Sequence, residues 1–388
     1  MNENKKSEES LRQNKNKKFD KVEVKLSDPE KKNYSNFEGG DKKSPFRVAL
    51  FLLVIFILGV IALIFFVFSF HEVVSESPKC GDGTFENYCS ITKPYQCVNQ
   101  TLIKNIPSCG CPDFFHFYNS SCISDYGSAK NEAVLKYFLN GNEYEIPFLV
   151  YPGVSDYLSN LSRTITYSKG ETPRRDDFAF KKIDEPVQKD YLMPLVVEIQ
   201  NLAPDSKDTQ AKIAVSLVQN IPYNSTSLVN SALSNFGVGL SRYPYQVVAE
   251  NAGACEGKSE LLAFLLREMD FGVVLFYYPE ENHEAVGIKC PIEKSYLRTG
   301  YCFVETTQPS PISFSSGEYL MSSGVGQLFS EPEIIFLGDG FSLSGDLEDY
   351  SDAEKLAKTL DKLKTAQTLN LAEELVFNGL KQKYSLND

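Results

Sequence analysis

A run of 23 residues without a charged side chain, from Val48 to Phe70, constrains this 388-residue chain more than any other feature. A helix that crosses a lipid bilayer needs about 20 consecutive apolar residues. The run has no polar stripe that could face water, so a soluble core helix fits it poorly. The sequence therefore predicts a transmembrane helix over residues 47–70.

Charged residues on either side of this run predict its orientation. Lys42, Lys43 and Arg47 precede it, and His71 and Glu72 follow it. Cytoplasmic flanks carry the excess of Lys and Arg, and the run is too long for the apolar core of a cleaved signal peptide. We expect a single-pass protein of the cell membrane, held in lipid by this helix, with a cytoplasmic N-terminus and an extracellular C-terminal domain.

The net charge divides at the predicted membrane helix. Residues 1–47 hold 13 Lys or Arg and 9 Asp or Glu, a balance of +4, so the −12 of the whole chain leaves −16 for the remainder. Such an acidic exterior argues against binding to nucleic acid. Residues 1–46 are rich in Lys, Asn, Glu and Ser and are predicted to form a disordered cytoplasmic tail.

Six of the nine cysteines lie within 43 residues, between Cys80 and Cys122. Small extracellular domains use closely spaced cysteines as disulfides because their apolar cores are thin. Zinc is the alternative, but the segment holds one histidine, His116, and no Cys-x-x-Cys pair. Fifteen connectivities are open, and only a bond between Cys109 and Cys111 is disfavoured by its spacing. The candidates for disulfide bonds are Cys80, Cys89, Cys97, Cys109, Cys111 and Cys122.

Four Asn-x-Ser/Thr triplets follow the predicted membrane helix. They begin at Asn99, Asn119, Asn160 and Asn224. Each is a candidate glycosylation site in an extracellular chain. Such triplets also arise by chance, so they are supporting observations for the external assignment.

Residues 125–388 carry the mixed pattern of an α+β domain. The segment 133–151 is typical of two strands around a turn at Asn140-Gly141-Asn142. The segment 152–185 mixes Pro, Gly and charges, and it is predicted to be an extended, loop-rich connection.

Helices are expected on both sides of the candidate chemistry. Apolar residues recur at helical spacing over 187–201, and a second helix is expected over 208–219, where Pro222 ends it. A C-terminal amphipathic helix is predicted from Ser351, which opens a capping box, to about Tyr384.

Cys255 stands at the start of a strongly predicted helix. Leucines and a methionine over residues 261–269 follow it on one apolar face. Unpaired N–H groups and the positive end of the helix dipole favour a thiolate there, and they also favour a developing oxyanion. Cys255 is therefore a candidate nucleophile, although buried cysteines are commonly inert.

Two strands after this helix carry an imidazole and a carboxylate. Residues 271–278 predict a first strand, residues 283–290 a second that begins with His283, and residues 301–307 a third that carries Glu305. The order of thiol, imidazole and carboxylate fits a nucleophile, a general base and an orienting group. The alternative carboxylates are Glu281 and Glu284.

The alternation of side chains along strands adds a geometric test. If His283 and Glu305 share one face of the sheet, Cys290 and Cys302 share the other. A disulfide between these two cysteines would leave Cys255 as the single free thiol. The two pairs require different registers for direct opposition, however, and an intermediate register makes both pairs diagonal.

The sequence GACEGKSELLAFLLREMDFGVVLFYYPEENHEAVGIKC, followed by YCFVETTQP, resembles the core of the transglutaminase-like superfamily. The likeness extends back to SLVQNIPYN and RYPYQVVAENAG, which resemble the helix and the approach to the nucleophile in membrane-anchored archaeal members, and it covers about residues 210–310. The pattern CGDGT…CGCP resembles short Cys-rich modules of archaeal surface proteins. The resemblance implies a papain-like fold with a triad of Cys255, His283 and Glu305, where the family usually has Asp as the acid.

Further expectations follow from this resemblance. Gln219 is a candidate second oxyanion donor, as a Gln is in papain-like enzymes, and a polar helix end before Pro222 is the alternative. Glu284-Ala285 and Phe303-Val304 stand where the family often has Trp. No metal and no cofactor are expected.

The predicted fold class is α+β: a papain-like, transglutaminase-like core, in which the Cys-bearing helix packs on an antiparallel sheet, preceded by one transmembrane helix and a small disulfide-rich module. The predicted parts are a tail (1–46), a membrane helix (47–70), the Cys-rich module (71–124), a strand- and loop-rich part (125–207), the core (208–330) and a C-terminal extension (331–388).

The expected function is that of a surface cysteine enzyme that cleaves or transfers acyl groups from amide bonds of a protein or peptide substrate through a thioester. Two alternatives remain open. One is a surface binding or assembly module that keeps the fold without turnover. The other is an amidohydrolase of glycan–peptide linkages.

Overall fold

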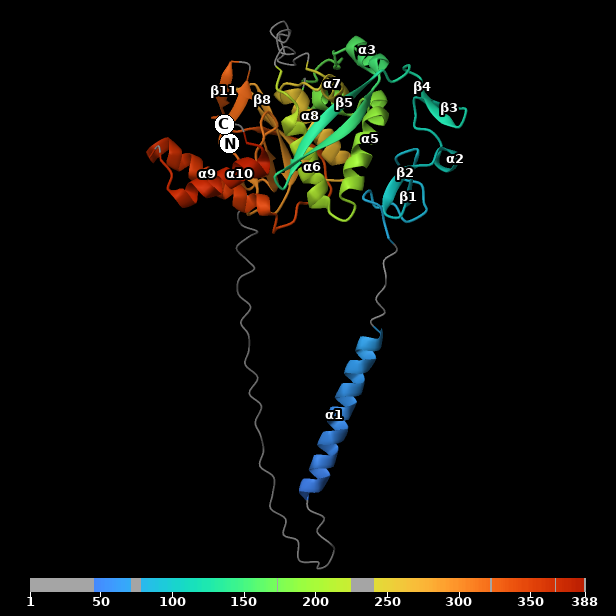
Figure 1. Ribbon diagram of the computed structural model, residues 1–388, viewed down its shortest axis with the longest axis vertical. Helices are drawn as coiled ribbons and strands as arrows, with labels where there is room; N and C mark the ends of the chain where they lie inside the picture. Colours follow the sequence, from blue (N-terminus) through green and yellow to red (C-terminus); the bar gives the residue numbers. More distant parts are fainter. Residues whose placement is uncertain are drawn as a thin grey trace, which may run out of the picture. The chain divides into compact units, whose positions relative to one another are not determined.

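The computed structural model describes residues 45–70, 78–172, 174–224, 241–321, 323–366 and 368–386. The chain divides into two compact units, residues 1–75 and 76–388. The first contains helix α1 (Pro45–Phe70), and the second contains every other described element (Figure 1). The predicted disordered tail lies, up to residue 44, outside the described residues.

Helix α1 covers the apolar run from which a membrane span was predicted. Over the described part of the chain, no helix is both long enough and apolar enough to cross a membrane. The side chains of α1 are described only over residues 49–63, which is shorter than the roughly 20 residues of a span. The predicted transmembrane helix over residues 47–70 is therefore corrected to a helix without an assigned span.

The Cys-rich segment folds as two small hairpins closed by disulfides. Its elements are β1 (Tyr95–Val98), β2 (Thr101–Lys104), α2 (Ile106–Cys109), β3 (Phe115–Tyr118) and β4 (Ser121–Ser124). The bonds are Cys80–Cys97, Cys89–Cys109 and Cys111–Cys122. The prediction of disulfides is confirmed, and zinc is excluded here because all six sulfurs are bonded. His116 instead pairs with Asp125 at 2.8 Å.

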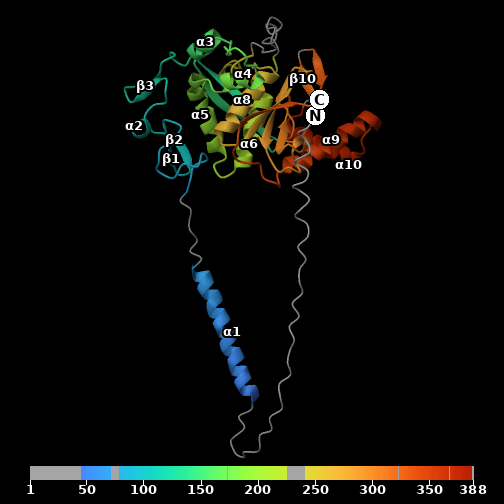
Figure 2. The same ribbon diagram turned by 180° about the vertical axis from the view of Figure 1, so that it is seen from behind.

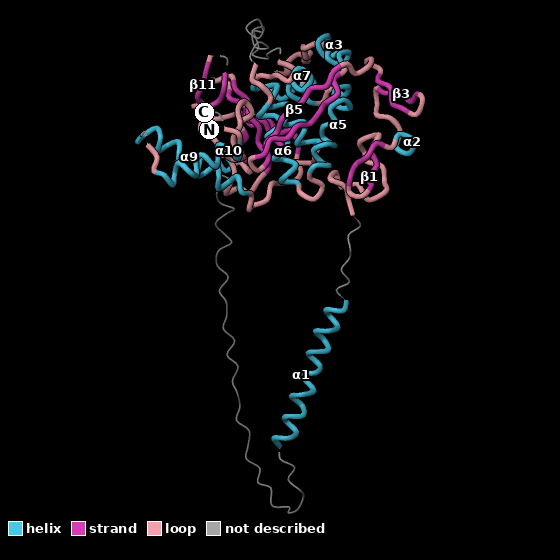
Figure 3. The backbone as a smooth tube through the Cα atoms, viewed as in Figure 1, coloured by secondary structure: helices cyan, strands magenta, loops and turns pink. Residues whose placement is uncertain are grey.

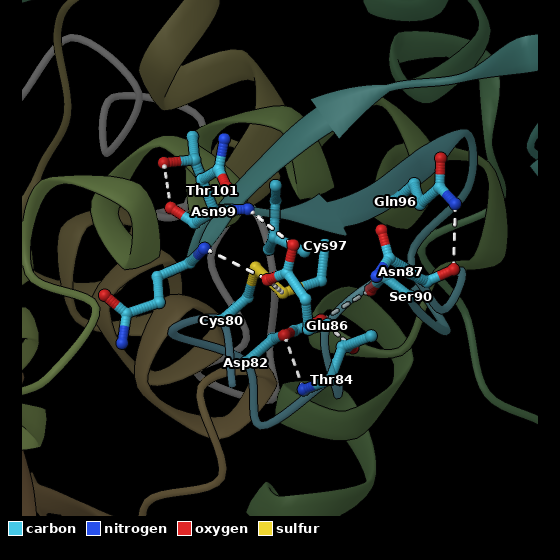
Figure 4. Close-up of a disulfide and its surroundings, with 12 residues drawn as sticks. Cys80, Asp82, Thr84, Glu86, Asn87, Ser90, Gln96, Cys97, Asn99 and Thr101 are labelled. Carbon is cyan, nitrogen blue, oxygen red and sulfur yellow. Dashed lines mark hydrogen bonds between the residues drawn. A yellow bond between two sulfur atoms is a disulfide. The ribbon is translucent and has the colours of Figure 1, made fainter. Parts of the chain in front are cut away.

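Polar contacts support the first hairpin around its disulfide. Glu86 accepts a hydrogen bond from the backbone N–H of Asn99 (2.8 Å), and Asp82 accepts one from that of Thr84 (2.9 Å; Figure 4). Leu102 and the two bonded cysteines, Cys80 and Cys97, form one apolar cluster with Val197 of helix α5 (Pro186–Leu202). The module has almost no core of its own, so disulfides and this contact hold it.

The four candidate glycosylation asparagines lie in different settings. Asn99 and Asn119 occupy positive-φ turn positions and are exposed. Asn160 ends helix α3 and is also exposed, whereas Asn224 is half-buried.

A layer of helices and one long hairpin forms the first half of the main body. The hairpin β5 (Asn131–Leu139) and β6 (Asn142–Val150) turns at Asn140 and Gly141, which have φ of 53° and 79°, as a two-residue turn requires. It lies across α6 (Figures 1 and 3). The helices are α3 (Pro152–Asn160), α4 (Arg175–Ile183), α5 (Pro186–Leu202), α6 (Lys207–Asn220), α7 (Pro244–Glu250) and α8 (Cys255–Glu268). The loop-rich connection predicted over 152–185 was wrong in part, because it contains α3 and α4.

A four-stranded antiparallel sheet forms the second half, with strand order β12-β7-β8-β9. Its strands are β7 (Val273–Tyr278), β8 (His283–Lys289), β9 (Tyr301–Val304) and β12 (Glu333–Gly338). Helix α8 packs on the face that presents Val286 and Val304 to the main core. The opposite face presents Ala285 and Phe303, which pack in a separate apolar cluster.

A short turn, a small hairpin and two helices complete the C-terminal part. A short 3₁₀ turn, η3 (Tyr296–Arg298), links β8 to β9, and a small hairpin is formed by β10 (Glu318–Met321) and β11 (Gly324–Gln327). The predicted C-terminal helix is two helices, α9 (Glu348–Ala366) and α10 (Leu371–Tyr384). Asn370 and Glu373 form a capping box at the start of α10 and separate the two.

The described residues thus form an α+β fold of helices and small antiparallel sheets. The Cys-bearing helix does pack on an antiparallel sheet. The sheet nevertheless has only four strands, one edge of which is β12 from the predicted C-terminal extension, and the β5–β6 hairpin pairs separately. These elements do not establish the predicted papain-like architecture, and that part of the fold class is withdrawn.

Candidate active site

Cys255 is the first residue of α8 and follows Ala254, whose backbone is extended. All nine cysteines lie in the described residues, and Cys255 is the one thiol outside the four disulfides. Its side chain is buried, with 4% exposed, and its sulfur lies 4.0 Å from the carbonyl oxygen of Asn282. The helix start therefore brings the free thiol to the beginning of β8.

His283 is the first residue of β8 and is 1% exposed. Its Nε2 lies 2.9 Å from Oε2 of Glu305. Its Nδ1 is buried and makes no hydrogen bond in the described part of the chain, while the Cys255 side chain is among the groups that raise the pKa of the ring. The carboxylate holds one ring nitrogen, and the other is left for the thiol.

Glu305 follows the last residue of β9, and both oxygens of its carboxylate make hydrogen bonds. Its Oε1 accepts hydrogen bonds from the backbone N–H of Thr306 (3.0 Å) and from the backbone N–H (2.8 Å) and hydroxyl (2.7 Å) of Thr307. Three donors on one oxygen fix the side chain so that Oε2 is presented to His283. A carboxylate fixed in this way can fix the imidazole in turn.

The strand register explains how a Glu serves where a shorter acid is usual. Val286 pairs with Val304, so continuing the pairing makes His283 and Glu305 diagonal neighbours rather than direct opposites. Diagonal neighbours are farther apart than opposite ones, and the extra methylene of Glu spans that distance. Direct opposition of His283 and Glu305 would require one register, and direct opposition of Cys290 and Cys302 would require another. The observed register lies midway between these two.

The same register leaves Cys290 and Cys302 diagonal, yet they form a disulfide. Cys290 lies one residue beyond the end of β8, where its N–H donates to Gly300. Their Cα atoms are 5.8 Å apart, which is within the usual range for disulfides. Leaving the strand thus lets Cys290 approach its partner, and the predicted disulfide is confirmed.

The charges of the site stabilise one another. Burial by itself lowers the pKa of His283, but the Glu305 carboxylate and the interaction with Cys255 more than offset it, and the pKa rises from 6.5 to about 10. Burial raises the pKa of Glu305, but the His283 charge and the hydrogen bonds from His283 and Thr307 outweigh this and lower it. Both groups are therefore charged at neutral pH.

Aromatic residues cover the imidazole. The Tyr319 ring, from β10, stacks on His283 with a centroid distance of 3.9 Å, and its hydroxyl donates to the carbonyl of Glu281 (3.1 Å). A Cβ on Gly326 would come within 2.5 Å of the Tyr319 ring, so only glycine fits that place. The β10–β11 hairpin thereby closes the site.

The other candidate residues make hydrogen bonds with groups outside the triad side chains. Gln219 donates its side-chain N–H to the carbonyl oxygens of Glu305 (2.9 Å) and Ser310 (3.2 Å), so it supports the loop that carries the acid. Glu281 accepts from Ser330, and Glu284 meets Arg175. Neither alternative acid contacts His283 in the described hydrogen bonds.

Sequence reasoning missed Tyr319, Arg175 and Lys182. Tyr319 lies in a four-residue strand of a Gly/Ser-rich segment, which gives no periodic signal. Arg175 and Lys182 are buried charges in α4, and charges in a segment of mixed polarity are ordinarily taken as solvent-exposed. The repeat of Arg175 and Lys182 at a spacing of seven residues was the one signal that both lie on one helical face.

Comparisons with known protein families, with curated proteins and with solved structures found no match. The geometry of the site therefore stands on the contacts of this chain alone.

The raised pKa of His283 predicts a pH dependence of stability. A histidine whose pKa is higher in the folded state stabilises the fold fully below its unfolded pKa of about 6.5, and that contribution is lost as the pH rises through about 10. The difference in unfolding free energy between wild type and His283→Gln should be largest at pH 6 and smallest at pH 10.5. Urea unfolding at both pH values measures it.

The exposed His116, which pairs with Asp125, provides the matched control. His116→Gln should show a difference from wild type that is small at both pH values, because exposed ion pairs contribute little. A His283→Gln difference that does not shrink between pH 6 and pH 10.5 would show that the imidazole is not held as a cation.

Proposed function

We propose that this protein is a cysteine-dependent enzyme that acts on amide bonds, as a hydrolase or an acyl-transferase. Cys255 is the nucleophile, His283 is the general base and acid, and Glu305 orients and charges the imidazole. The observation that carries the proposal is the buried imidazole, which Glu305 binds at Nε2 (2.9 Å) while Nδ1 is left for the only free thiol.

Acylation follows from this arrangement. The Cys255 thiolate attacks the carbonyl carbon of the substrate and forms the sulfur–carbon bond. The first N–H groups of α8 have no partner within the helix and can bind the oxyanion that develops. The carbon–nitrogen bond then breaks, and the His283 imidazolium gives its proton to the leaving amine. A thioester and a neutral imidazole remain.

Deacylation reverses the roles. Neutral His283 takes a proton from water, or from an acceptor amine, as that molecule attacks the thioester. The sulfur–carbon bond breaks, and the thiolate and imidazolium pair is restored. Hydrolysis and acyl transfer differ only in the attacking molecule, so one site serves either reaction.

Two further observations support the setting of this activity. Four disulfides point to an oxidising, extracytoplasmic compartment, and a protein or peptide substrate there fits amide chemistry. The resemblance of residues 210–310 to the transglutaminase-like superfamily agrees with the same order of nucleophile, base and acid, and membership in that superfamily is part of the proposal.

One observation favours a non-catalytic binding module instead. Cys255, His283 and Glu305 are 4%, 1% and 3% exposed, and Tyr319 covers the imidazole. Four cavities in the described part of the chain, among them one of about 610 Å³ beside α5, are lined by other residues. A closed site suits a binding module, whereas turnover needs an opening through which a substrate reaches Cys255.

Labelling with an N-substituted chloroacetamide, a thiol-reactive amide mimic, separates the two functions. The full chain is labelled in native buffer and in urea, and intact mass gives the rates. An activated Cys255 should react faster in the native protein than in the unfolded one, despite its burial, and Cys255→Ala should not be labelled. A thiol that reacts only after unfolding would leave the binding module as the function.

A further inference from the structure

Five buried ionisable side chains form a cluster beside α8, here called the charge cluster. Its members come from three elements: α4, α8 and β8. Figure 2 shows α4 beside α8. The residues are Arg175, Lys182, Glu256, Glu260 and Glu284, with side chains between 1% and 13% exposed. None of them belongs to the proposed triad.

Two members of the charge cluster are sequence neighbours of the reacting residues. Glu256 directly follows Cys255 on α8, and Glu284 directly follows His283 on β8. One nitrogen of the Arg175 guanidinium lies 3.3 Å from Oε1 of Glu256 and 3.3 Å from Oε2 of Glu284. A single side chain thus joins the start of the nucleophile helix to the start of the base strand.

Arg175 is itself held in place. Its guanidinium lies over the ring of Tyr277, 4.4 Å from the centroid, and Tyr277 is the residue paired with Glu284 across the sheet. Lys182, two turns along α4, contacts Glu256 and lies 2.7 Å from Glu260. Because Arg175 and Lys182 both lie on α4, this helix forms ion pairs with α8 from two positions.

The three carboxyls of the cluster respond differently to burial. Burial and the neighbouring carboxylates raise the pKa of Glu260, although Lys182 opposes them. Burial also raises the pKa of Glu284, to about 7, although Arg175 opposes it. Burial acts on Glu256 as well, but the charges of Lys182 and Arg175 outweigh it and lower its pKa. Arg175 is the cation placed between Glu256 and Glu284.

We propose that Arg175 is a positioning residue that sets the approach of Cys255 to His283 through Glu256 and Glu284. The proposal rests on the proposed function, because it needs thiol and imidazole to act as a pair. The planar guanidinium lies over the Tyr277 ring while one of its nitrogens meets both carboxylates, an arrangement that the point charge of an ammonium group would not hold. A displacement of about 1 Å between reacting groups costs about 10²-fold in rate.

The test is a double-mutant cycle of Arg175→Met and His283→Ala in the full chain, read as the rate of Cys255 alkylation by iodoacetamide. This reagent is uncharged, so loss of a cation does not change its attraction to the site. Arg175→Met should slow alkylation at least tenfold when His283 is present and should have less than a twofold effect in the His283→Ala background. Such non-additivity is the mark of coupled residues.

Each outcome that contradicts the expected rates overturns a different part of the proposal. If His283→Ala alone leaves the rate unchanged, the thiol and imidazole are not a pair and the proposed function fails. If His283→Ala slows the reaction but Arg175→Met does not, the function stands and the positioning role is overturned. If Arg175→Met slows alkylation equally in both backgrounds, the positioning role is also overturned, because the effect of Arg175 then does not depend on His283.

Two variants guard against a loss of folding. Arg175→Lys keeps the charge in the buried cluster but loses the planar guanidinium, so it should stay folded by circular dichroism and still slow alkylation severalfold. A Lys variant that is folded and as reactive as wild type overturns the role of the planar guanidinium. The matched control is Arg174→Met, because the Arg174 side chain is 72% exposed and pairs with Asp176; its rate should equal that of wild type.

Discussion

Replacing His283 with alanine is expected to slow the Cys255-dependent release of p-nitrophenolate from p-nitrophenyl acetate by about 10⁴-fold, the upper end of general acid–base catalysis. The variant loses the base that forms the thiolate and the cation that stabilises it, since Cys255 and His283 influence one another's charge in the site. Stopped-flow absorbance gives the acylation burst and the steady-state rate in one trace. Cys255→Ala supplies the baseline.

Glu305→Gln should have a smaller but still large effect, about 10²- to 10⁴-fold, by analogy with loss of the acid in a serine triad. Oε1 faces three donors from Thr306 and Thr307, and Oε2 faces the imidazole. If the amide oxygen of Gln meets the three donors, its NH₂ faces Nε2 of His283. The imidazole must then carry its proton on Nδ1, where it cannot accept one from the thiol.

Glu280→Gln is the matched control, because Glu280 is an exposed glutamate close to His283 in sequence. It should keep the wild-type rate. A Glu305→Gln variant that is folded and within a factor of three of wild type would remove the carboxylate from the mechanism. Addition of hydroxylamine to the wild type then separates hydrolysis from acyl transfer, since an accepted amine raises the steady-state rate without changing the burst.

The elements that place the triad were predictable because they carry simple patterns. The apolar face of residues 261–269 predicts α8, and three short apolar segments predict β7, β8 and β9 in the right order. Alternation along the strands predicts which residues share a face. The register itself was not predicted, because the acid and the cysteines each favour a different one; the structure adopts the intermediate register, in which Val286 pairs with Val304.

Residues that act over long sequence separations were not predictable from such patterns. Helix α4 is short and begins among charges, so its segment looked like a connection, yet it brings Arg175 to carboxylates 81 and 109 residues away. Tyr319 reaches His283 from a hairpin with no apolar periodicity. The apolar run before residue 70 gave the strongest signal and the prediction of a membrane span, which the described residues do not support.

Lys182→Met is expected to lower the free energy of unfolding by about 3–5 kcal/mol, the usual cost of removing one partner from a buried ion pair. Lys182 contacts Glu256 and Ser241 and lies 2.7 Å from Glu260, and all of these groups are buried. Methionine fills similar space but leaves carboxylate charge without its cation. Guanidinium unfolding, followed by far-ultraviolet circular dichroism with the disulfides intact, gives the difference.

Substitutions of the two partner carboxyls sharpen this expectation, because their pKa values shift in opposite directions. Lys182 and Arg175 lower the pKa of Glu256, so Glu256→Gln removes an anion, leaves both cations in excess and should also cost several kcal/mol. Burial and the neighbouring carboxylates raise the pKa of Glu260, so Glu260→Gln should cost less than Glu256→Gln. If Glu260→Gln were as costly as Glu256→Gln, the two carboxyls would stabilise Lys182 equally, and the expectation that Glu256 is its main counter-charge would be wrong.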